Sequence, residues 1–239
     1  MLMDDAEVLA VQFQILMRRV AIVLFALVLP VACHPAYAQD PPPPLPRIVV
    51  DVHALVPVFP NDATQLADSR NLSVTELPGA GMGGRVGAHV YLFKWRAVTV
   101  GVGGEAIVGR SSSAPAGSTV LAADGVTTLT LVPVDERLTS VGSQLSLNFG
   151  SGHGWSYISG GIGRSRWSVH PSGQAEIPAD TESLPTTNYG GGARWSIKRH
   201  VGFGLDVRIY EIQPGSQTQY GSGSPRTRLL VIGAGLFLK

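Results

Sequence analysis

From residue 47 onward, apolar and polar residues alternate with a period of two along much of the chain. This alternation is typical of β-strands whose two faces meet different surroundings. It recurs in eight segments, at residues 47–59, 81–93, 97–110, 137–149, 155–169, 187–197, 201–212 and 226–238. No segment of useful length in this region repeats with the roughly 3.6-residue period of an amphipathic helix. The pattern therefore predicts an all-β fold.

The connections between these segments are alternately short and long. The short ones are KWR at residues 94–96, GSGHG at residues 150–154 and KRH at residues 198–200. After the first, third, fifth and seventh segments the chain instead runs through at least a dozen residues rich in Pro, Ser, Gly, Thr and Asp. We therefore expect an antiparallel up-and-down meander, with short turns and both of its ends on one side and long loops on the other.

One face of the predicted strands is apolar and the other is nearly free of large side chains. A three-residue turn at KRH would pair Ile197 with Val201, Trp195 with Phe203 and Ala193 with Leu205 on the apolar face. The opposite face carries glycine together with Arg194, Asp206 and Arg208. An eight-stranded barrel has an interior only about wide enough for side chains. Glycine there would leave space for a few long polar residues, so we place the apolar face in lipid and the glycine face in the lumen.

The even number of strands and their length favour a transmembrane barrel. Strands of about 9 to 11 residues cross a bilayer at a tilt. Within lipid every backbone group needs a partner, and a closed barrel leaves no unpaired edge. We therefore predict an eight-stranded antiparallel up-and-down transmembrane β-barrel over residues 47–239.

The N-terminal segment has the pattern of a secretory signal peptide, predicted at residues 1–38. Arg18 and Arg19 precede an apolar run, Val20–Ala32, and Ala36–Ala38 supplies a small-x-small cleavage site. The run is shorter than the roughly 20 residues of a membrane-spanning helix. A proline-rich periplasmic tether of the polyproline type follows at residues 39–46.

Three features of this segment leave alternatives open. The apolar run could be retained as an anchor, and Cys33 could carry a lipid, although Pro30 stands where lipidation sites have an aliphatic residue. The acidic stretch before Met17 is unusual for a signal peptide, so translation could start at Met17 instead of Met1.

The other two tight turns predict further cross-strand pairs. A three-residue turn at KWR would pair Leu92 with Val98, Val90 with Val100 and Ala88 with Val102 towards lipid, and Arg85 with Glu105 inside. The turn at GSGHG would pair Phe149 with Trp155 and Leu147 with Tyr157. Aromatic residues would then gather near the short turns as a periplasmic girdle. This predicted girdle consists of Phe149, Trp155, Tyr157, Trp195 and Phe203.

Seven charged residues are expected to face the lumen. An isolated charge in such a place is costly, so these residues should pair with one another or keep water. The predicted lumenal set is Asp51, Arg85, Glu105, Arg164, Arg194, Asp206 and Arg208. We expect a polar plug that holds the barrel rigid, in preference to a gated ion path.

The strand meander and the segment Asn188–Ile212 resemble the penultimate hairpin of small outer-membrane β-barrel proteins of the OmpA-like or OmpX-like type. The resemblance covers roughly residues 47–239 and implies an eight-stranded barrel with periplasmic N- and C-termini. It also implies that the barrel assembly machinery reads the C-terminal strand. Such strands usually end on an aromatic residue, whereas here Phe237 is followed by Leu238 and Lys239.

Composition and motifs limit the kinds of ligand and reaction that the sequence suggests. A net charge of +1 gives no reason to expect nucleic acid as a partner. The G-x-G-x-x-G match at Gly79–Gly84 joins no βαβ unit, and chance matches are expected among 29 glycines. The six histidines are dispersed, with His53 and His89 expected inside. We predict no catalytic set, no metal and no cofactor.

The sequence thus favours a structural or surface-interaction role through long extracellular loops, with outer-membrane lipid and an unidentified extracellular ligand or surface as partners. Two alternatives stay open. A barrel enzyme acting on envelope lipid would need a nucleophile and a base at the rim, and a soluble periplasmic ligand-binding barrel would need a lumen lined by large apolar residues.

Overall fold

The computed structural model describes residues 42–61, 63–113, 119–121, 128–130, 133–216 and 223–239. The predicted signal peptide at residues 1–38 and the first part of the predicted tether lie outside the described residues. Residues 43–239 form one compact unit.

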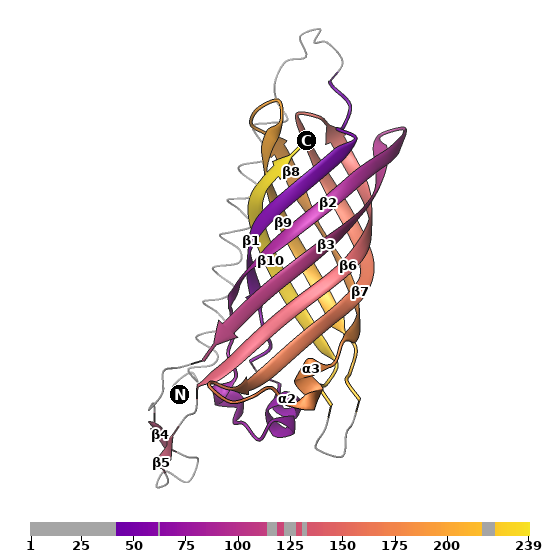
Figure 1. The fold of residues 1–239 in the computed structure, drawn as a ribbon. Coiled ribbons are helices and arrows are strands. Elements are labelled where there is room, and N and C mark those ends of the chain that lie inside the picture. Colours follow the sequence, from indigo (N-terminus) through magenta and orange to yellow (C-terminus); the bar gives the residue numbers. More distant parts are fainter. Residues whose placement is uncertain (1–41, 62, 114–118, 122–127, 131–132, 217–222) are drawn as a thin grey trace, which may run out of the picture. The chain divides into compact units, whose positions relative to one another are not determined.

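This unit is a closed barrel in which every neighbouring pair of strands is antiparallel (Figure 1). The order around the barrel is β1-β10-β9-β8-β7-β6-β3-β2. The strands are β1 (Ile48–Val58), β2 (Met82–Trp95), β3 (Val98–Ser112), β6 (Val134–Ser151), β7 (Gly154–Pro171), β8 (Leu184–Ser196), β9 (Val201–Ile212) and β10 (Thr227–Leu238). The predicted all-β fold and its eight strands are confirmed.

The long connections contain short elements that the sequence pattern did not predict. They are α2 (Thr64–Ser69), the 3₁₀ turn η2 (Val74–Glu76), α3 (Pro178–Thr181) and a two-stranded sheet of β4 (Thr119–Leu121) and β5 (Thr128–Thr130). Elements of three to six residues are too short to show a periodic pattern. In the described part of the chain, no helix is long and apolar enough to cross a membrane.

The three short turns were predicted with different success. At KRH the observed register is the predicted one, with Trp195 opposite Phe203 and Ala193 opposite Leu205. At GSGHG the prediction is wrong by one residue. The observed pairs there are Phe149–Ser156, Gly150–Trp155 and Leu147–Ile158.

A tight turn explains the error at GSGHG. Ser151 pairs with Gly154, so that only two residues form the turn. Gly150 has φ +133°, a conformation that other residues rarely adopt, and a Cβ there would lie 2.8 Å from Trp155 Cα. Because side chains alternate along a strand, a slip of one residue moves all of β7 to the other face.

The register at KWR also differs from the prediction. The turn is tighter than expected, and a register shift follows between Tyr91 and Phe93. The observed pairs are Trp95–Val98, Phe93–Val100, Val90–Val102, Gly87–Glu105 and Arg85–Ile107. The net offset is two residues, so Arg85 and Glu105 keep their faces but lie diagonally and not opposite each other.

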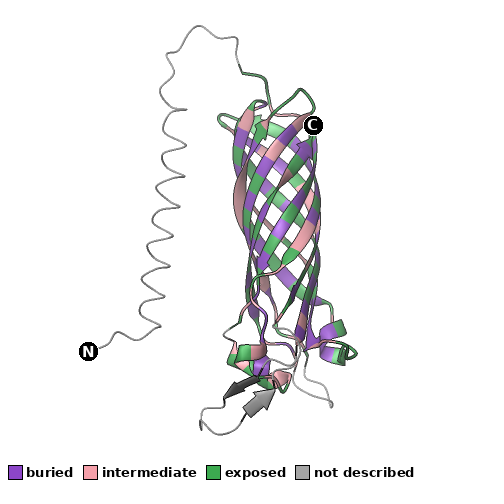
Figure 2. Cartoon of the chain, turned by 90° about the vertical axis from the view of Figure 1, so that its left-hand side faces the viewer, coloured by how far each residue is buried: buried purple, intermediate pink, exposed green. Residues whose placement is uncertain are grey.

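Burial alternates along the strands, which appear as bands of buried and exposed residues (Figure 2). Large apolar side chains are exposed on the outer face of every barrel strand. They include Val52, Val86, Val102, Leu145, Ile158, Trp195, Val207 and Ile232. A continuous apolar outer surface of this kind is typical of a barrel surrounded by lipid.

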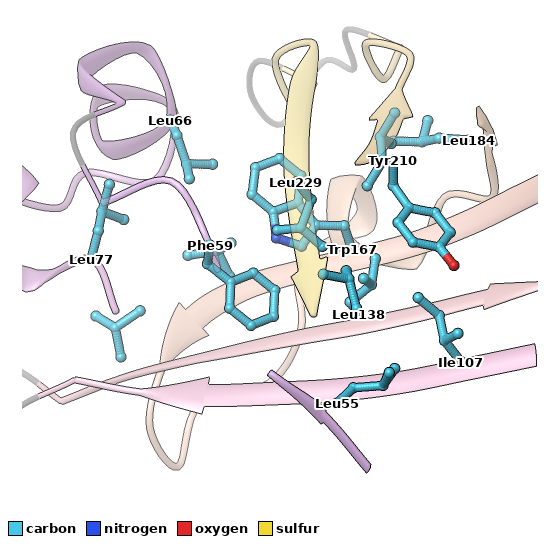
Figure 3. Packing of buried hydrophobic residues seen from close by; sticks show 14 of the residues in the cluster. Leu55, Phe59, Leu66, Leu77, Ile107, Leu138, Trp167, Leu184, Tyr210 and Leu229 are labelled. Carbon is cyan, nitrogen blue, oxygen red and sulfur yellow. The ribbon is translucent and has the colours of Figure 1, made fainter. Parts of the chain in front are cut away.

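Two apolar clusters lie inside the barrel, one towards each end. The long-loop cluster includes Leu55, Ile107, Leu138 and Trp167, and Leu66 of α2 packs into it (Figure 3). The short-turn cluster consists of Val49, Tyr91, Trp155 and Phe237, with Leu45 of the predicted tether packed against it. The tether is also held at the short turns, because the Gly152 amide donates to the Pro43 carbonyl oxygen at 2.8 Å. Between the two clusters the interior is polar.

Candidate functional site

Six charged side chains meet in the middle of the barrel, between the two apolar clusters. They come from inward-facing positions of five strands, and all are buried. We call them the lumen charge network, which consists of Asp51, Arg85, Glu105, Arg194, Asp206 and Arg208. Three carboxylates and three guanidinium groups balance in formal charge, which limits the cost of holding them away from bulk water.

Asp51 of β1 binds two arginines from different sides of the barrel. Arg194 Nη2, from β8, donates to Asp51 Oδ2 at 2.7 Å. Arg85 Nη2, from β2, donates to Asp51 Oδ1 at 3.3 Å. The imidazole Nε2 of His89 lies 3.5 Å from Oδ2. Because β1 and β8 are not neighbours in the barrel, the pair Asp51–Arg194 crosses the lumen.

Asp206 of β9 is the second acceptor. Arg85 Nη1 donates to Asp206 Oδ1 at 2.7 Å, and the Tyr157 hydroxyl donates to Oδ2. Arg208 Nη2 also contacts Oδ2, at 3.4 Å. Arg85 therefore joins β2 to β1 on one side and to β9 on the other.

Glu105 of β3 completes the set of carboxylates. Its Oε2 lies 3.6 Å from Arg85 Nη1 and 3.8 Å from Arg208 Nε. The Tyr210 hydroxyl donates to Oε1. Arg85 and Glu105 do meet, although the predicted direct opposition is wrong, because a diagonal cross-strand position is still within reach of an arginine side chain.

Neutral side chains accept further hydrogen bonds from the Nη atoms of two arginines. Arg194 Nη1 donates to the Tyr91 hydroxyl at 2.9 Å. Arg208 Nη1 and Nη2 donate to Asn188 Oδ1 and to Ser159 Oγ, both at 2.8 Å. The sequence pattern did not predict these partners. Their inward positions were the available signal, but it was misread for Tyr157 and Ser159 because β7 was placed one residue out of phase.

Glycine makes room for this network, in keeping with its inward positions. A Cβ at Gly192 would lie 2.8 Å from the Tyr157 hydroxyl, and one at Gly87 would lie 3.0 Å from Asp51 Oδ1. A Cβ at Gly101 would lie 2.7 Å from the Tyr91 ring. The contacts at Gly192 and Gly101 are closer than packed atoms tolerate, and the one at Gly87 is tight.

Arg164 does not belong to the lumen, so that assignment is wrong. The side chain is exposed on the outer face of β7 and donates to the Ser183 carbonyl oxygen at 2.9 Å. The physical reason is the one-residue slip at the GSGHG turn, which exchanges the faces of β7.

The same slip changes the aromatic girdle. Phe149 and Trp195 are 38% and 47% exposed on the outer face, and Phe203 stacks on Trp195 with ring centroids 6.3 Å apart. Trp155 and Tyr157 are only 3% and 4% exposed and point inward, so their assignment to the girdle is wrong. Trp155 instead packs edge-on against Phe237 in the short-turn cluster.

A second buried ion pair lies in the long loops. Arg70, just after α2, donates through Nη2 to Asp180 Oδ1 of α3 and to Ser224 Oγ, both at 2.9 Å. The Val169 amide donates to the same carboxylate oxygen at 3.3 Å. Burial raises the pKa of Asp180, and the Arg70 guanidinium opposes that rise. The pair ties the β1–β2, β7–β8 and β9–β10 connections together.

Comparisons with known proteins give a likeness to solved structures alone. No protein-family model matches the chain, and no curated protein matches it. Neisserial surface protein A (NspA) is similar with a TM-score of 0.49 and 15% identity, over 81% of this chain and 97% of that one. OprG from Pseudomonas aeruginosa has a TM-score of 0.45 and 10% identity, over 83% of this chain and 98% of that one. Ail, the attachment invasion locus protein of Yersinia pestis, has a TM-score of 0.39 and 14% identity, over 80% and 95%.

Likenesses this distant say nothing about function, and the class of the protein rests on its own geometry. Its eight antiparallel strands close in up-and-down order, with an apolar outer face and a polar middle section inside. The fold is that of a small outer-membrane β-barrel. Among the described residues, no three His, Cys, Asp or Glu side chains are grouped as a metal ion would require.

Proposed function

We propose that this chain is a bacterial outer-membrane protein that acts at the cell surface through its long loops and does not conduct solutes through its lumen. The observation that carries the proposal is the lumen charge network. Its ion pairs reach from β1 to β8 and from β2 to β9 at 2.7 Å. An eight-stranded barrel is only about wide enough for side chains, so pairs that cross it leave little room for a passing ion.

The two apolar clusters support a closed lumen as well. The long-loop cluster contains fully buried Phe59 and Trp167 on one side of the network. The short-turn cluster contains Trp155 and Phe237 on the other side. An ion entering from either end would have to pass large, mostly apolar side chains, which offer little to replace its water shell. Such a passage is costly.

The organisation of the long loops supports a surface role. Arg70, Asp180 and Ser224 connect three of the loops through buried contacts of 2.9 Å. Loops that are tied together present a defined surface, and loops at one end of a rigid scaffold often carry binding function. We place this end outside the cell and the short turns in the periplasm, with both termini of the barrel.

Ion conductance tests the closed lumen. The full chain is folded into lipid vesicles, and its folding is checked by heat-dependent migration on gels. The vesicles are then fused with a planar bilayer. We expect no stepwise current from the wild-type barrel. A steady current from preparations that show only the folded band would contradict the proposal.

Epitope insertion tests the orientation. Gly173 and Gln174 lie exposed in the β7–β8 connection. A tag placed between Gly173 and Gln174 should therefore be tolerated and should be stained on intact cells. A tag in the KRH turn, between Lys198 and Arg199, is the matched control and should be stained only after permeabilisation. The opposite result would reverse the orientation.

A further inference from the structure

Four arginines gather on the outer face of three adjacent strands, β3, β6 and β7. All of them are exposed, and they occupy the half of these strands nearer the long loops. We call this set the outer arginine row, which consists of Arg110, Arg137, Arg164 and Arg166. The lumen charge network does not use any of these residues.

The strand register places the row side by side. Arg110 of β3 lies directly opposite Arg137 of β6. Arg137 lies opposite Ser168 of β7, so Arg166 is its diagonal neighbour on the same face. Arg164 follows two positions along β7 on that face. Long side chains at opposite and diagonal positions reach the same space.

Like charges placed opposite each other destabilise a sheet unless something neutralises them. Among the described residues, Arg110, Arg137 and Arg166 have no ion-pair partner. Asp135 lies on the same face two positions from Arg137, but it forms no salt bridge with the row. A multivalent anion held between the arginines would remove the repulsion.

Two hollows on the outer face adjoin the row. One, of about 600 Å³, is lined by Arg110 and Arg137 together with Asp135, Glu136 and Met82 among others. The other, of about 790 Å³, runs past Val141 and Ile162 on the lipid-facing surface and reaches Arg164 and Pro185. Val141 and Ile162 are 61% and 68% exposed. Arg110 and Arg137 are the exposed charges of the first hollow, since Glu136 is buried and Asp135 is half-buried. The exposed arginines therefore lie next to an apolar groove.

We propose that this surface binds a phosphorylated, acylated lipid of the leaflet next to the long loops. Its phosphate groups would lie on the outer arginine row, and an acyl chain would lie in the groove along Val141 and Ile162. Guanidinium groups match phosphate oxygens in pairs of hydrogen bonds, and the apolar stems of the side chains extend along the lipid surface. The inference rests on the proposed membrane location.

The position of the outer arginine row on the barrel favours a lipid over a soluble anion as its ligand. Along β6, the outward residues on the short-turn side of Arg137 are largely apolar and include Val141, Leu145 and Leu147. The row thus stands at the edge of the apolar surface, where the headgroups of a bilayer lie. A charge at this depth is costly without a partner, and a lipid phosphate is the partner available there.

The test measures binding of diphosphoryl lipid A to the folded full chain in detergent by native mass spectrometry. The variant R110Q/R137Q/R166Q should bind at least about tenfold more weakly than wild type, since each lost guanidinium removes charge-assisted hydrogen bonds. The matched control R96Q/K198Q/R199Q removes three exposed positive charges at the short-turn end and should bind as wild type does. Equal binding by both triple variants would overturn the site.

Two further measurements distinguish the contribution of the phosphate groups to binding from that of the acyl chain. The variant Val141→Trp keeps the row but fills the groove, and it should weaken lipid binding at least about threefold without changing the folded gel band. Inorganic phosphate at millimolar concentration should not displace the lipid. Full displacement by phosphate, or no effect of Val141→Trp, would reduce the row to an anion site and overturn the lipid assignment. Failure of the wild-type chain to fold in vesicles would instead count against the proposed membrane location.

Discussion

Arg85 and Asp206 are 121 residues apart in the chain, yet Arg85 Nη1 donates to Asp206 Oδ1 at 2.7 Å inside the barrel. Their strands, β2 and β9, are not neighbours in the sheet. The contact therefore exists only because the sheet closes on itself. Since both side chains are buried, it contributes to stability as part of a network and not as a surface pair.

Removing one partner of this pair should be costly. Arg85→Met or Asp206→Asn should each lower the free energy of unfolding by about 3–5 kcal/mol, because each leaves a buried charge without its partner. The double variant should be more stable than the sum predicts by about 1 kcal/mol or more. Urea unfolding in lipid vesicles measures the free energies of unfolding of the two single variants and the double variant.

The exposed pair Arg228–Glu211, with a contact of 2.6 Å, is the matched control for this cycle. Its coupling should be much smaller than that of Arg85–Asp206, because water screens exposed charges. Strict additivity of Arg85→Met and Asp206→Asn would show that the two side chains do not meet.

Substitution of a crowded lumen-facing glycine, even by alanine, should destabilise the barrel. A Cβ at Gly192 would collide with the Leu205 carbonyl oxygen and lie 2.8 Å from the Tyr157 hydroxyl. Gly192→Ala should therefore destabilise the barrel by about 1–3 kcal/mol. Gly160→Ala on the outer face is the control, since its nearest contact would be an ordinary 3.6 Å. Equal unfolding midpoints in urea would mean that the lumen is less crowded than described.

Substitutions on the outer face can test which alternate residues of β7 point towards lipid, which we call the phase of the strand. Ile158 is 57% exposed on the outer face, and Leu205 of β9 is 40% exposed. Placing Arg at either position should cost about 2–4 kcal/mol near the bilayer midplane. Ser172→Arg, in the β7–β8 connection, should have little effect on unfolding in vesicles. If Ile158→Arg were as harmless as Ser172→Arg, β7 would have the opposite phase.

The link between the long loops should control their resistance to protease. Arg70→Ala removes the donor that joins Asp180 to Ser224. We expect proteinase K to cut the long loops about tenfold faster, because loss of a buried ion pair lowers the free energy of local opening. The unfolding midpoint of the barrel should change little. Cleavage at the wild-type rate would show that other contacts hold the loops.

Much of the architecture could be predicted from the sequence because side chains alternate locally along a strand. All eight barrel strands were located within a few residues of their observed bounds. The KRH register was also correct, since Trp195 and Phe203 both carry apolar side chains on the lipid side and a short turn leaves few alternatives.

The phase of β7 could not be decided in this way. Trp155 and Tyr157 on one face and Ile158 and Ile162 on the other are both suitable for lipid, so either phase satisfies the alternation. The choice depends on the positive φ of Gly150 and on the hydrogen bonds that aromatic residues make inside. Trp155 Nε1 donates to the Tyr91 hydroxyl at 3.2 Å, which lipid could not provide.

The sequence by itself determined which residues face inward on most strands, and hence that acids and arginines would share the lumen. Only the tertiary structure decided the partners, because Asp51–Arg194 and Arg85–Asp206 join strands that become close through closure and stagger of the barrel. The same holds for α2, whose six residues show no period but whose Leu66 is buried against the long-loop cluster. Alternation is a local property of the chain, whereas contacts across a lumen depend on the whole sheet.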